Sequence, residues 1–475
     1  MKSIVRVFLL AFFVFATFLT GCSQEDAFGD DPMGALRFSA DTLSFGTVFS
    51  TLGTTTAWIK VYNTADEKIR ISGIRLKSGG NSGFRINVDG VSDYSFTDVD
   101  IPAKDSLFIF VALTAPERGS STPLPVRDAI LFQSDNGQKQ IVVEAFSQDA
   151  VIWRGKTITS DTTLTAGQPF IIYDSLVVAR NVTLQVAQGV TLHLHAQSKV
   201  IVHGTIKVAG TAVAPVTFRG DRLDDILLGF PYDYFPGQWG SICLTGSSYD
   251  NEFDYVHIRG ACSGLIADSS ALDRCKLKIN HSVIHNMVDY CLISNHSKLS
   301  VINSQLSNSG GSTVCLNGGE TDFIHCTITN YQHLISRNGP TLKLVNPDDS
   351  APMKADFVNC IVYGNQMSEI GFTNINEARN VWDLLFRNCL LRSDKEGLST
   401  YTTCTDCLFS KNPLFLKLGS TSENDQYDFR LDSLSSARHM ADLTYSQKYP
   451  YDMNGIYRLG GSGSDIGAYQ WSPLY

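Results

Sequence analysis

Apolar residues along most of this chain alternate with polar ones in short runs, and Asn, Gly and Ser separate the runs. Between residues 277 and 391 one phrase recurs, in which a large apolar residue precedes an Asn or His by two positions and a small residue follows it. The intervals between the Asn or His positions are 22, 22, 34 and 29 residues. Period-two runs predict strands, and a repeat near 22 residues predicts stacked coils. The five positions are His281, Asn303, His325, Asn359 and Asn388.

Residues at the same place in this repeat are expected to lie on top of one another in successive coils. The repeat therefore predicts a ladder of large apolar side chains, a ladder of Ser and Cys, and a ladder of Asn. A second phrase alternates with it, as Gly264-Leu265, Cys291-Leu292 and Cys315-Leu316. A helical solenoid would need a 3.6-residue period, so we predict a parallel β-helix with loops at the two longer intervals. The apolar positions are Ile279, Val301, Phe323, Phe357 and Phe386, and the small ones are Ser282, Ser304, Cys326, Cys360 and Cys389.

Two earlier regions are also rich in predicted strands. Short alternating runs between 156 and 220 open the solenoid, whose first coil needs a cover and is expected to be atypical. Between 36 and 149, short β-branched and aromatic segments such as 56–61 and 106–113 are separated by Gly, Asn and Asp turns. That spacing predicts a sandwich of about seven strands. We therefore predict an all-β chain, with a β-sandwich at 36–150 and a β-helix at 151–475.

The N-terminus has the features of a secretory signal. Lys2 and Arg6 precede an apolar run at 7–19 that is too short to span a bilayer. The run ends in Leu19-Thr20-Gly21-Cys22, which resembles a bacterial lipobox. The resemblance implies that residues 1–21 are removed as a signal peptide and that the lipidated Cys22 anchors the protein in the outer membrane.

An acidic tether is expected at 22–35, which holds several Asp and Glu residues, and we expect it to be disordered. Its acidic start resembles an export signal that leads to the cell surface, and the periplasmic face is the alternative. The net charge is −9 and the basic residues are not clustered, which argues against nucleic acid as a partner.

Cys and His residues are expected to be structural. Ten Cys residues besides Cys22 lie between 243 and 407, and those at the small position of the repeat should pack as buried thiols, with one or two disulfide bridges left open. Cys404 and Cys407 have metal-site spacing but no second Cys pair. His193, His195 and His203 resemble a metal cluster, but stacked polar residues on an outer sheet face are the commoner explanation. We expect no metal site and no cofactor, with calcium left open for an enzyme.

The candidate site is an insertion at 221–237, which interrupts the coils with acidic and aromatic residues. Exposed aromatic rings beside carboxylates could stack on sugar rings and hydrogen-bond their hydroxyl groups. The alternative is that the insertion braces the flank of the β-helix with its aromatic residues buried. The candidate glycan-binding residues are Asp224, Asp225, Tyr232, Tyr234 and Trp239.

Two resemblances extend this picture. Residues 43–48, 61–63 and 101–105 resemble Ig-like domains of the ASH and major-sperm-protein group, which implies a spacer or a binding module. Residues 359–365, 427–431 and 465–469 resemble exported right-handed parallel β-helix proteins of the pectate-lyase-like superfamily, and more narrowly the choice-of-anchor Q lipoproteins and adhesin-like proteins. That resemblance implies a right-handed β-helix whose C-terminal segment closes the last coil. One departure is Ser435-Ser436-Ala437, where the family has Ser-Pro-Ala.

An enzymatic function has to be considered, because many β-helix proteins cleave acidic polysaccharides. A lyase needs converging carboxylates with a base above them, and a hydrolase needs a carboxylate pair. We expect acidic residues not to recur one coil apart between 240 and 391, and we therefore assign no catalytic residue. We expect non-catalytic adhesion or binding of a polysaccharide or cell-surface glycan. The alternatives are a lyase or glycoside hydrolase acting in a side groove near 221–239, and a purely structural rod.

Overall fold

The computed structural model describes residues 28–473 apart from 228–229, 347–352, 374–381, 396–397, 399–401, 421–422 and 462. The predicted signal peptide, Cys22 and the start of the tether lie outside the described residues. The chain divides into two compact units, Met1–Gln148 and Asp149–Tyr475. None of the described helices combines the length and apolarity needed to cross a membrane.

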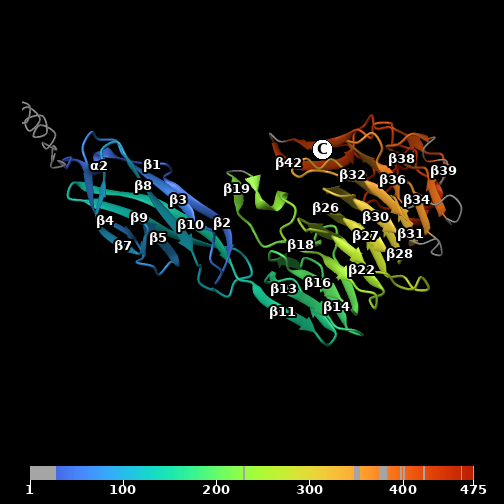
Figure 1. Ribbon diagram of the computed structural model, residues 1–475, viewed down its shortest axis with the longest axis horizontal. Coiled ribbons are helices and arrows are strands. Elements are labelled where there is room, and N and C mark those ends of the chain that lie inside the picture. The colour runs from blue at the N-terminus through green and yellow to red at the C-terminus, as the bar shows by residue number, and fades with distance from the viewer. Residues whose placement is uncertain are drawn as a thin grey trace, which may run out of the picture. The chain divides into compact units, whose positions relative to one another are not determined.

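The first unit is a β-sandwich of two five-stranded sheets, with ten strands where the sequence predicted about seven (Figure 1). Alternate residues of both sheets point inward and form one core that includes Phe84, Ile109 and Phe132, each 0% exposed. One sheet has the order β1 (Leu36–Phe38), β3 (Ala57–Asn63), β8 (Ser106–Leu113), β5 (Phe84–Val88) and β6 (Val91–Asp93). The other has the order β2 (Thr42–Phe49), β10 (Gly137–Gln148), β9 (Leu124–Ser134), β4 (Ile69–Leu76) and β7 (Ser95–Ile101).

The described part of the predicted tether is ordered, so the expectation of disorder is wrong for residues 28–35. Phe28 forms a bridge with Lys68, and the short helix α2 (Pro32–Ala35) is capped by the Asp31 side chain. Met33 within α2 is 5% exposed and packs against the sandwich core. Burial of this apolar side chain stabilises a segment that its acidic neighbours would leave in solvent.

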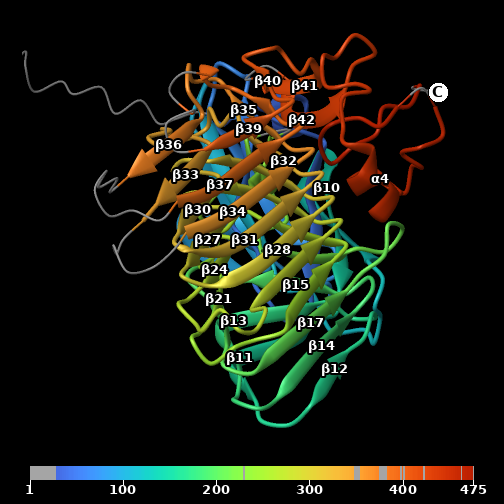
Figure 2. The same cartoon turned by 90° about the vertical axis from the view of Figure 1, so that its right-hand side faces the viewer.

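The second unit is a parallel β-helix whose coils contribute strands to three ladders (Figure 2). The first ladder is β12 (Thr162–Leu164), β14 (Thr183–Ala187), β17 (Thr205–Ala209), β22 (Asn251–Asp254), β25 (Leu277–Asn280), β28 (Lys298–Ile302), β31 (Gly319–Ile324), β34 (Met353–Val358), β37 (Trp382–Arg387) and β39 (Thr403–Thr405). The second ladder is β13 (Phe170–Val178), β15 (Thr191–Leu194), β18 (Val216–Gly220), β23 (Val256–Arg259), β26 (Val283–Met287), β29 (Gln305–Ser309), β32 (Thr327–Asn330), β35 (Ile361–Gly364), β38 (Leu390–Leu391) and β40 (Leu408–Phe409).

The third ladder begins with β11, which pairs along nearly all of β13 and covers the first coil. The long β13 then continues into both the second and the third ladders, so the first coil is atypical, as expected. The predicted fold of a sandwich followed by a parallel β-helix is confirmed. The third ladder is β11 (Val151–Ile158), β13, β16 (Lys199–Val202), β21 (Ile242–Leu244), β24 (Leu265–Ala267), β27 (Leu292–Asn295), β30 (Val314–Asn317), β33 (Leu342–Val345) and β36 (Ile370–Thr373).

The predicted ladder of large apolar side chains forms in the first ladder. Phe323 is in register with Phe357, and Phe357 with Phe386. Their rings stack with centroids 4.9 and 4.8 Å apart, and all three side chains are fully buried. Each ring is covered only because the next coil repeats it, which is the physical meaning of the repeat.

The recurring Asn or His lies at the corner between the first and second ladders, in the left-handed backbone region. The φ angles are 45° at His281, 47° at Asn303, 50° at His325, 55° at Asn359 and 48° at Asn388. Asn and His enter this region more readily than other residues with a side chain. The repeat of these residue types therefore records a sharp turn of the backbone in each coil.

The predicted ladder of small residues follows each corner and satisfies backbone carbonyl groups of the preceding coil. The thiol of Cys360 donates to the Phe323 carbonyl at 3.3 Å, and the thiol of Cys389 donates to the Phe357 carbonyl at 3.3 Å. All ten Cys residues in the described part of the chain are free thiols. A larger side chain at these positions would force neighbouring coils apart.

The second phrase is only partly in register. Leu265 pairs with Leu292, but Leu292 pairs with Val314, and Cys315 instead pairs with Ile293. The alignment of Cys315-Leu316 with Cys291-Leu292 is therefore wrong by two residues. Shifting the register of a strand by two residues leaves the same side chains facing inward, so the apolar pattern could not reveal this error.

The C-terminal segment lies along the side of the stack, which differs from the expected closure of the last coil. Met440, Asp442 and Tyr451 each use a backbone carbonyl to accept a hydrogen bond from a corner Asn of a successively earlier coil. Helix α4 (Leu443–Lys448) lies beside the coils in Figure 2. The partners are Asn388, Asn359 and Asn303.

Apolar residues explain this position of the C-terminal segment. Ile361 and Leu390 point outward from the second ladder, and each is 0% exposed because Leu431 and Ile466 pack against them. Without the segment, the outer face of the later coils would expose large apolar side chains to water. The hairpin of β41 (Phe415–Ser420) and β42 (Glu423–Leu431) leads into this segment.

Candidate functional site

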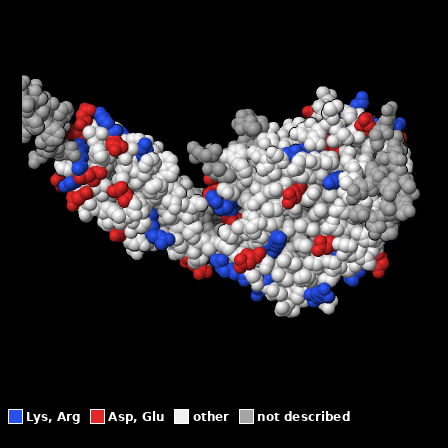
Figure 3. All heavy atoms as spheres, viewed as in Figure 1, with Lys and Arg blue, Asp and Glu red and all other residues white. Residues whose placement is uncertain are grey.

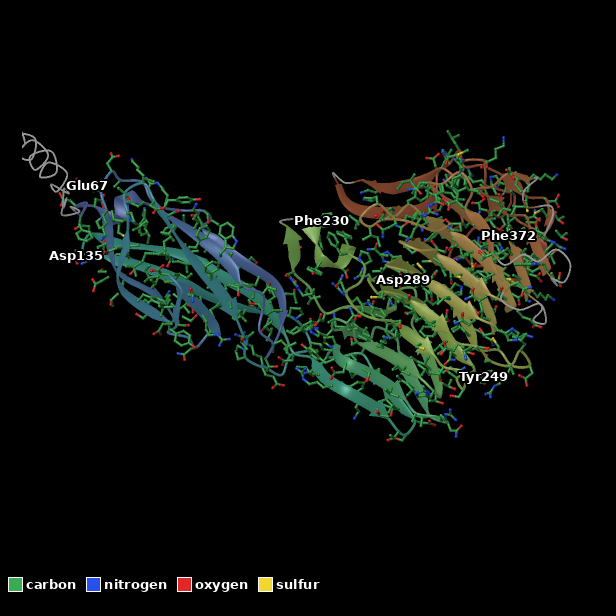
Figure 4. All side chains as sticks on the ribbon, in the orientation of Figure 1. Glu67, Asp135, Phe230, Tyr249, Asp289 and Phe372 are labelled. Carbon is green, nitrogen blue, oxygen red and sulfur yellow. The ribbon has the colours of Figure 1, made fainter. Side chains whose placement is uncertain are left out.

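The insertion leaves the second ladder after β18 and packs back on the outer face of the same ladder. It contains β19 (Asp225–Leu227), β20 (Phe230–Pro231) and the 3-10 turn η1 (Tyr232–Tyr234), near the labelled Phe230 in Figure 4. The Gln238 amide nitrogen donates to the carbonyl groups of Tyr232 at 2.6 Å and Phe235 at 2.9 Å. The side chain of Asn286 in β26 donates to the carbonyl of Tyr234. These bonds fix the turn against the coils.

The prediction that Trp239 binds sugars is wrong, because its side chain is 0% exposed within the β-helix core. Its indole nitrogen donates to the Arg259 carbonyl at 2.9 Å. A buried ring with a satisfied nitrogen cannot stack on a ligand. Trp239 instead anchors the point at which the chain re-enters the coils.

The other four predicted residues are spread over the insertion. Arg222 donates to Asp224 at 2.6 Å and its guanidinium lies 4.1 Å from the centroid of the Tyr232 ring, so one face of that ring is covered. Asp225 is exposed, and its backbone pairs with that of Pro231 in the β19–β20 hairpin. Tyr234 is half-buried, with its ring 5.7 Å from the Phe230 ring. The half-buried rings favour the brace over an open sugar-binding platform.

Asp233, which the sequence did not single out, is the main electrostatic contact of the insertion. It forms ion pairs with Arg219 at 3.1 Å and Arg259 at 2.7 Å. Both arginines point outward from adjacent strands of the second ladder, one coil apart, directly after the paired residues Phe218 and Ile258. We call Arg219 and Arg259 the arginine pair.

Three histidines surround the arginine pair on the same outer face. His193 is in register with Arg219, and His285 with Arg259, while His257 precedes Arg259 by two residues. Burial, reinforced by the nearby arginines, lowers the pKa of His193 and of His285 to about 3. Burial and Arg259 also lower the pKa of His257. These imidazoles are therefore neutral at physiological pH and act as hydrogen-bonding groups.

A second polar cluster lies at the start of the insertion. The Nδ1 atom of His195 is 2.6 Å from Asp221, and the side chain of His195 is 47% exposed. The Tyr173 ring lies 4.5 Å from the His195 ring, and the Arg154 guanidinium lies 3.9 Å from the Tyr173 ring. Burial and Asp221 raise the pKa of Tyr173, so its phenol keeps its proton. This cluster combines a base oriented by a carboxylate with a neutral acid.

Within the described part of the chain, no group of three or more His, Cys, Asp or Glu side chains could hold a metal ion. The three histidines considered from the sequence each have another partner. His193 contacts the Gly220 carbonyl at 3.2 Å, His195 contacts Asp221, and His203 contacts the Thr245 hydroxyl at 3.1 Å. On the face seen in Figure 3, positive and negative side chains alternate over the β-helix without a continuous patch of one sign.

The sequence contained a signal for the arginine pair. Residues 216–219 and 256–259 have the same form, in which an outward-facing Arg follows a buried apolar residue. The interval of 40 residues, lengthened by the insertion, hid the repeat. Asp233 could not be distinguished from Asp224 and Asp225, because only the folded insertion determines which carboxylate meets the coils.

Comparisons with known proteins do not assign the chain to a family. No protein-family model matches it, and no curated protein matches it. Among solved structures, a family 123 glycoside hydrolase from Clostridium perfringens shares 8% identity over 23% of each chain with a TM-score of 0.18. The VesB protease of Vibrio cholerae shares 13% identity over 24% of this chain and 32% of its own, with a TM-score of 0.17. Similarity this slight bears on neither fold nor activity.

Proposed function

We propose that the protein is a lipoprotein, anchored in the outer membrane through Cys22 and displayed at the cell surface, that binds acidic glycans without cleaving them. The signal sequence and the lipobox-like residues support the anchor. The flank of the β-helix beside the insertion supports the binding. Adhesion to an acidic polysaccharide, or to a glycan on another cell, would follow from these two properties.

The observation that carries the binding proposal is the surplus of guanidinium groups over carboxylates at the arginine pair. Arg219 and Arg259 share Asp233 as their ion-pair partner among the described residues, which leaves one positive charge. The side chain of Arg259 is 30% exposed. Guanidinium groups form charge-assisted hydrogen bonds with carboxylates, and neutral imidazoles hydrogen-bond hydroxyl groups. A uronic acid residue offers a carboxylate and hydroxyl groups on one sugar ring.

The test is the binding of polygalacturonate by residues 23–475, measured by titration calorimetry. Arg259→Gln should weaken binding about tenfold, because one charge-assisted contact contributes about 1.4 kcal/mol. The matched control is Arg274→Gln, which breaks the exposed ion pair with Asp250 elsewhere on the β-helix and should leave the affinity unchanged. Equal affinities of Arg259→Gln and the unsubstituted protein would contradict the proposal.

A second candidate function, a polysaccharide lyase, is favoured by the pair of His195 and Asp221. His195 is exposed and oriented by a carboxylate, which suits a base that takes the proton next to a uronate carboxyl group. Elimination would then break the glycosidic bond and leave an unsaturated sugar. Formation of unsaturated ends that stops in His195→Asn would establish the lyase in place of the non-catalytic function.

A further inference from the structure

One sheet of the β-sandwich exposes large aromatic side chains that its fold does not require. The exposed fractions are 53% for Trp58, 36% for Tyr62, 41% for Phe108 and 42% for Phe110. The alternate residues of the same two strands point inward and already supply the core, as with Ile109, which is 0% exposed. Aromatic rings left in water on one sheet face commonly mark a binding surface.

The register gathers these rings into one surface on neighbouring strands. Trp58 of β3 is opposite Phe110 of β8, and Lys60 is opposite Phe108. The ring centroids of Trp58 and Phe108 are 5.4 Å apart, and those of Phe108 and Phe110 are 6.2 Å apart. The Lys60 ammonium lies 5.2 Å from the ring centroids of both Tyr62 and Phe108. We call this surface the aromatic face.

The aromatic face carries positive charge and no carboxylate at its strand positions. Arg37 is opposite Tyr62, and Arg85 is opposite Ala112 in the next strand. Arg37 donates to the carbonyls of Gly34 and Leu36, and Arg85 donates to the Thr114 hydroxyl, so the described contacts leave both charges unneutralised. The register assigns to this face Arg37, Trp58, Lys60, Tyr62, Arg85, Asn87, Ser92, Ser106, Phe108, Phe110 and Ala112.

The other sheet of the sandwich shows that this charge pattern is local. There Asp100 pairs with Lys68 at 3.0 Å and Arg70 at 2.7 Å, and Arg127 pairs with Glu144 at 3.0 Å. The chain as a whole has a net charge of −9. Three cations on one sheet face whose strand positions hold no carboxylate therefore favour an anionic partner by charge complementarity.

We propose that the aromatic face binds a polysaccharide that carries carboxylate groups, such as a chain of uronic acid residues. The apolar faces of the sugar rings would stack on Trp58, Phe108 and Phe110, and the carboxylates would pair with Lys60, Arg37 or Arg85. A dimer formed through this face would place the three cations of one copy against the three cations of the other, and these like charges would repel. Single-stranded nucleic acid also stacks on aromatic rings, but its phosphates are held in a positively charged groove. This face is a sheet with three separated cations, in a chain whose N-terminal sequence predicts export.

This surface goes beyond the arginine pair, because it lies on the other compact unit and depends on different residues. The sequence contained a signal for it. In β3 the residues Trp58, Lys60 and Tyr62 alternate with the buried Ile59 and Val61, so large side chains occupy both sides of the strand.

The test is the binding of polygalacturonate and of neutral dextran by residues 23–475, measured by affinity electrophoresis. Trp58→Ala and Phe108→Ala should each weaken polygalacturonate binding roughly tenfold, as loss of a stacking contact does. Lys60→Gln should weaken it without removing a ring. The matched control is Phe146→Ala, which removes a ring that is 44% exposed on the other sheet and should change nothing.

Several outcomes would overturn the proposal. They are unchanged affinity in Trp58→Ala and Phe108→Ala, equal binding of dextran, stronger binding of oligothymidylate or of anionic vesicles, and dimerisation that Trp58→Ala abolishes. Arg259→Gln separates this proposal from the proposed function. Loss of affinity in Arg259→Gln alone would place the site on the β-helix and refute the aromatic face, whereas loss in Trp58→Ala alone would refute the arginine pair.

Discussion

At the scale of single residues, the corner Asn combines a left-handed backbone with hydrogen bonds to the C-terminal segment. Asn359 has φ of 55°, accepts from the Asp442 backbone nitrogen at 2.6 Å, and donates to the Asp442 carbonyl at 3.1 Å. Both features explain why Asn recurs. The sequence predicted the ladder of Asn, but it could not show the turn, because spacing alone says nothing about φ.

Two substitutions at Asn359 separate these roles. Asn359→Gly keeps the left-handed turn and loses the hydrogen bonds, which should lower the free energy of unfolding by about 1–3 kcal/mol. Asn359→Ala loses the same bonds and adds about 1–2 kcal/mol of backbone strain. In urea denaturation, Asn359→Gly should therefore have a higher free energy of unfolding than Asn359→Ala, although a protein is ordinarily more stable with Ala than with Gly. The opposite ranking would show that the turn has no role in the repeat.

The low pKa values of His193 and His285 predict that the free energy of unfolding depends on pH in the acid range. Because the pKa values of His193 and His285 are about 3 in the folded state and near 6.5 when unfolded, only the unfolded chain gains these protons between those pH values. Stability should therefore fall as the pH is lowered from 6.5 towards 3, by up to roughly 1.4 kcal/mol per pH unit for each imidazole.

Denaturation of His193→Gln across this pH range gives the measurement. The free energy of unfolding of this variant should change less with pH than that of the unsubstituted protein. The other titrating groups are common to both proteins and cancel in the difference. Parallel curves would mean that His193 is protonated in the folded protein.

At the scale of elements, the insertion acts as a brace, and its fixed point is Asp233. The sequence left open whether the insertion binds sugars or braces the flank, because composition does not distinguish a buried carboxylate from an exposed one. The structure buries Trp239 and pairs Asp233 with two arginines of the coils, whereas Asp224 forms an ion pair with Arg222, two residues away within the insertion.

Asp233→Asn should loosen the insertion by removing the charge that both arginines share, with a loss of about 1–3 kcal/mol. The matched control is Asp224→Asn, whose partner Arg222 is 39% exposed and whose loss should cost about 0–1 kcal/mol. Limited proteolysis within 221–237 should be faster in Asp233→Asn than in Asp224→Asn. Equal rates would show that Asp233 does not hold the insertion.

The C-terminal segment could not be placed from the sequence. Ile361 is followed by Val362 and Leu390 by Leu391, and such adjacent apolar residues indicate that both faces of these strands are covered. The pattern does not say which segment covers the outer face. Only the packing of Leu431 and Ile466 on the outer face explains why the later coils carry apolar residues on both sides.

At the scale of the whole molecule, the sequence predicted both folds because period-two runs and a 22-residue repeat follow directly from strand geometry. The expectation that acidic residues do not recur one coil apart is wrong, because Asp322 and Asp356 are in register in neighbouring coils. The sequence did not predict the two proposed surfaces, because binding residues need no periodicity. The arginine pair and the aromatic face both consist of outward-facing residues from separate strands, which only the register brings together. Each surface presents more positive charge than negative, and this common feature is the basis for the choice of an acidic glycan.

The most direct test of this account is to incubate residues 23–475 with polygalacturonate and with dextran, and to follow both binding and chain length. We expect saturable binding of polygalacturonate that weakens with salt, little binding of dextran, and no change in the length of either polymer. Unsaturated or new reducing ends would show that the protein is an enzyme. Absence of binding to both polymers would contradict a glycan-binding function and leave a structural rod.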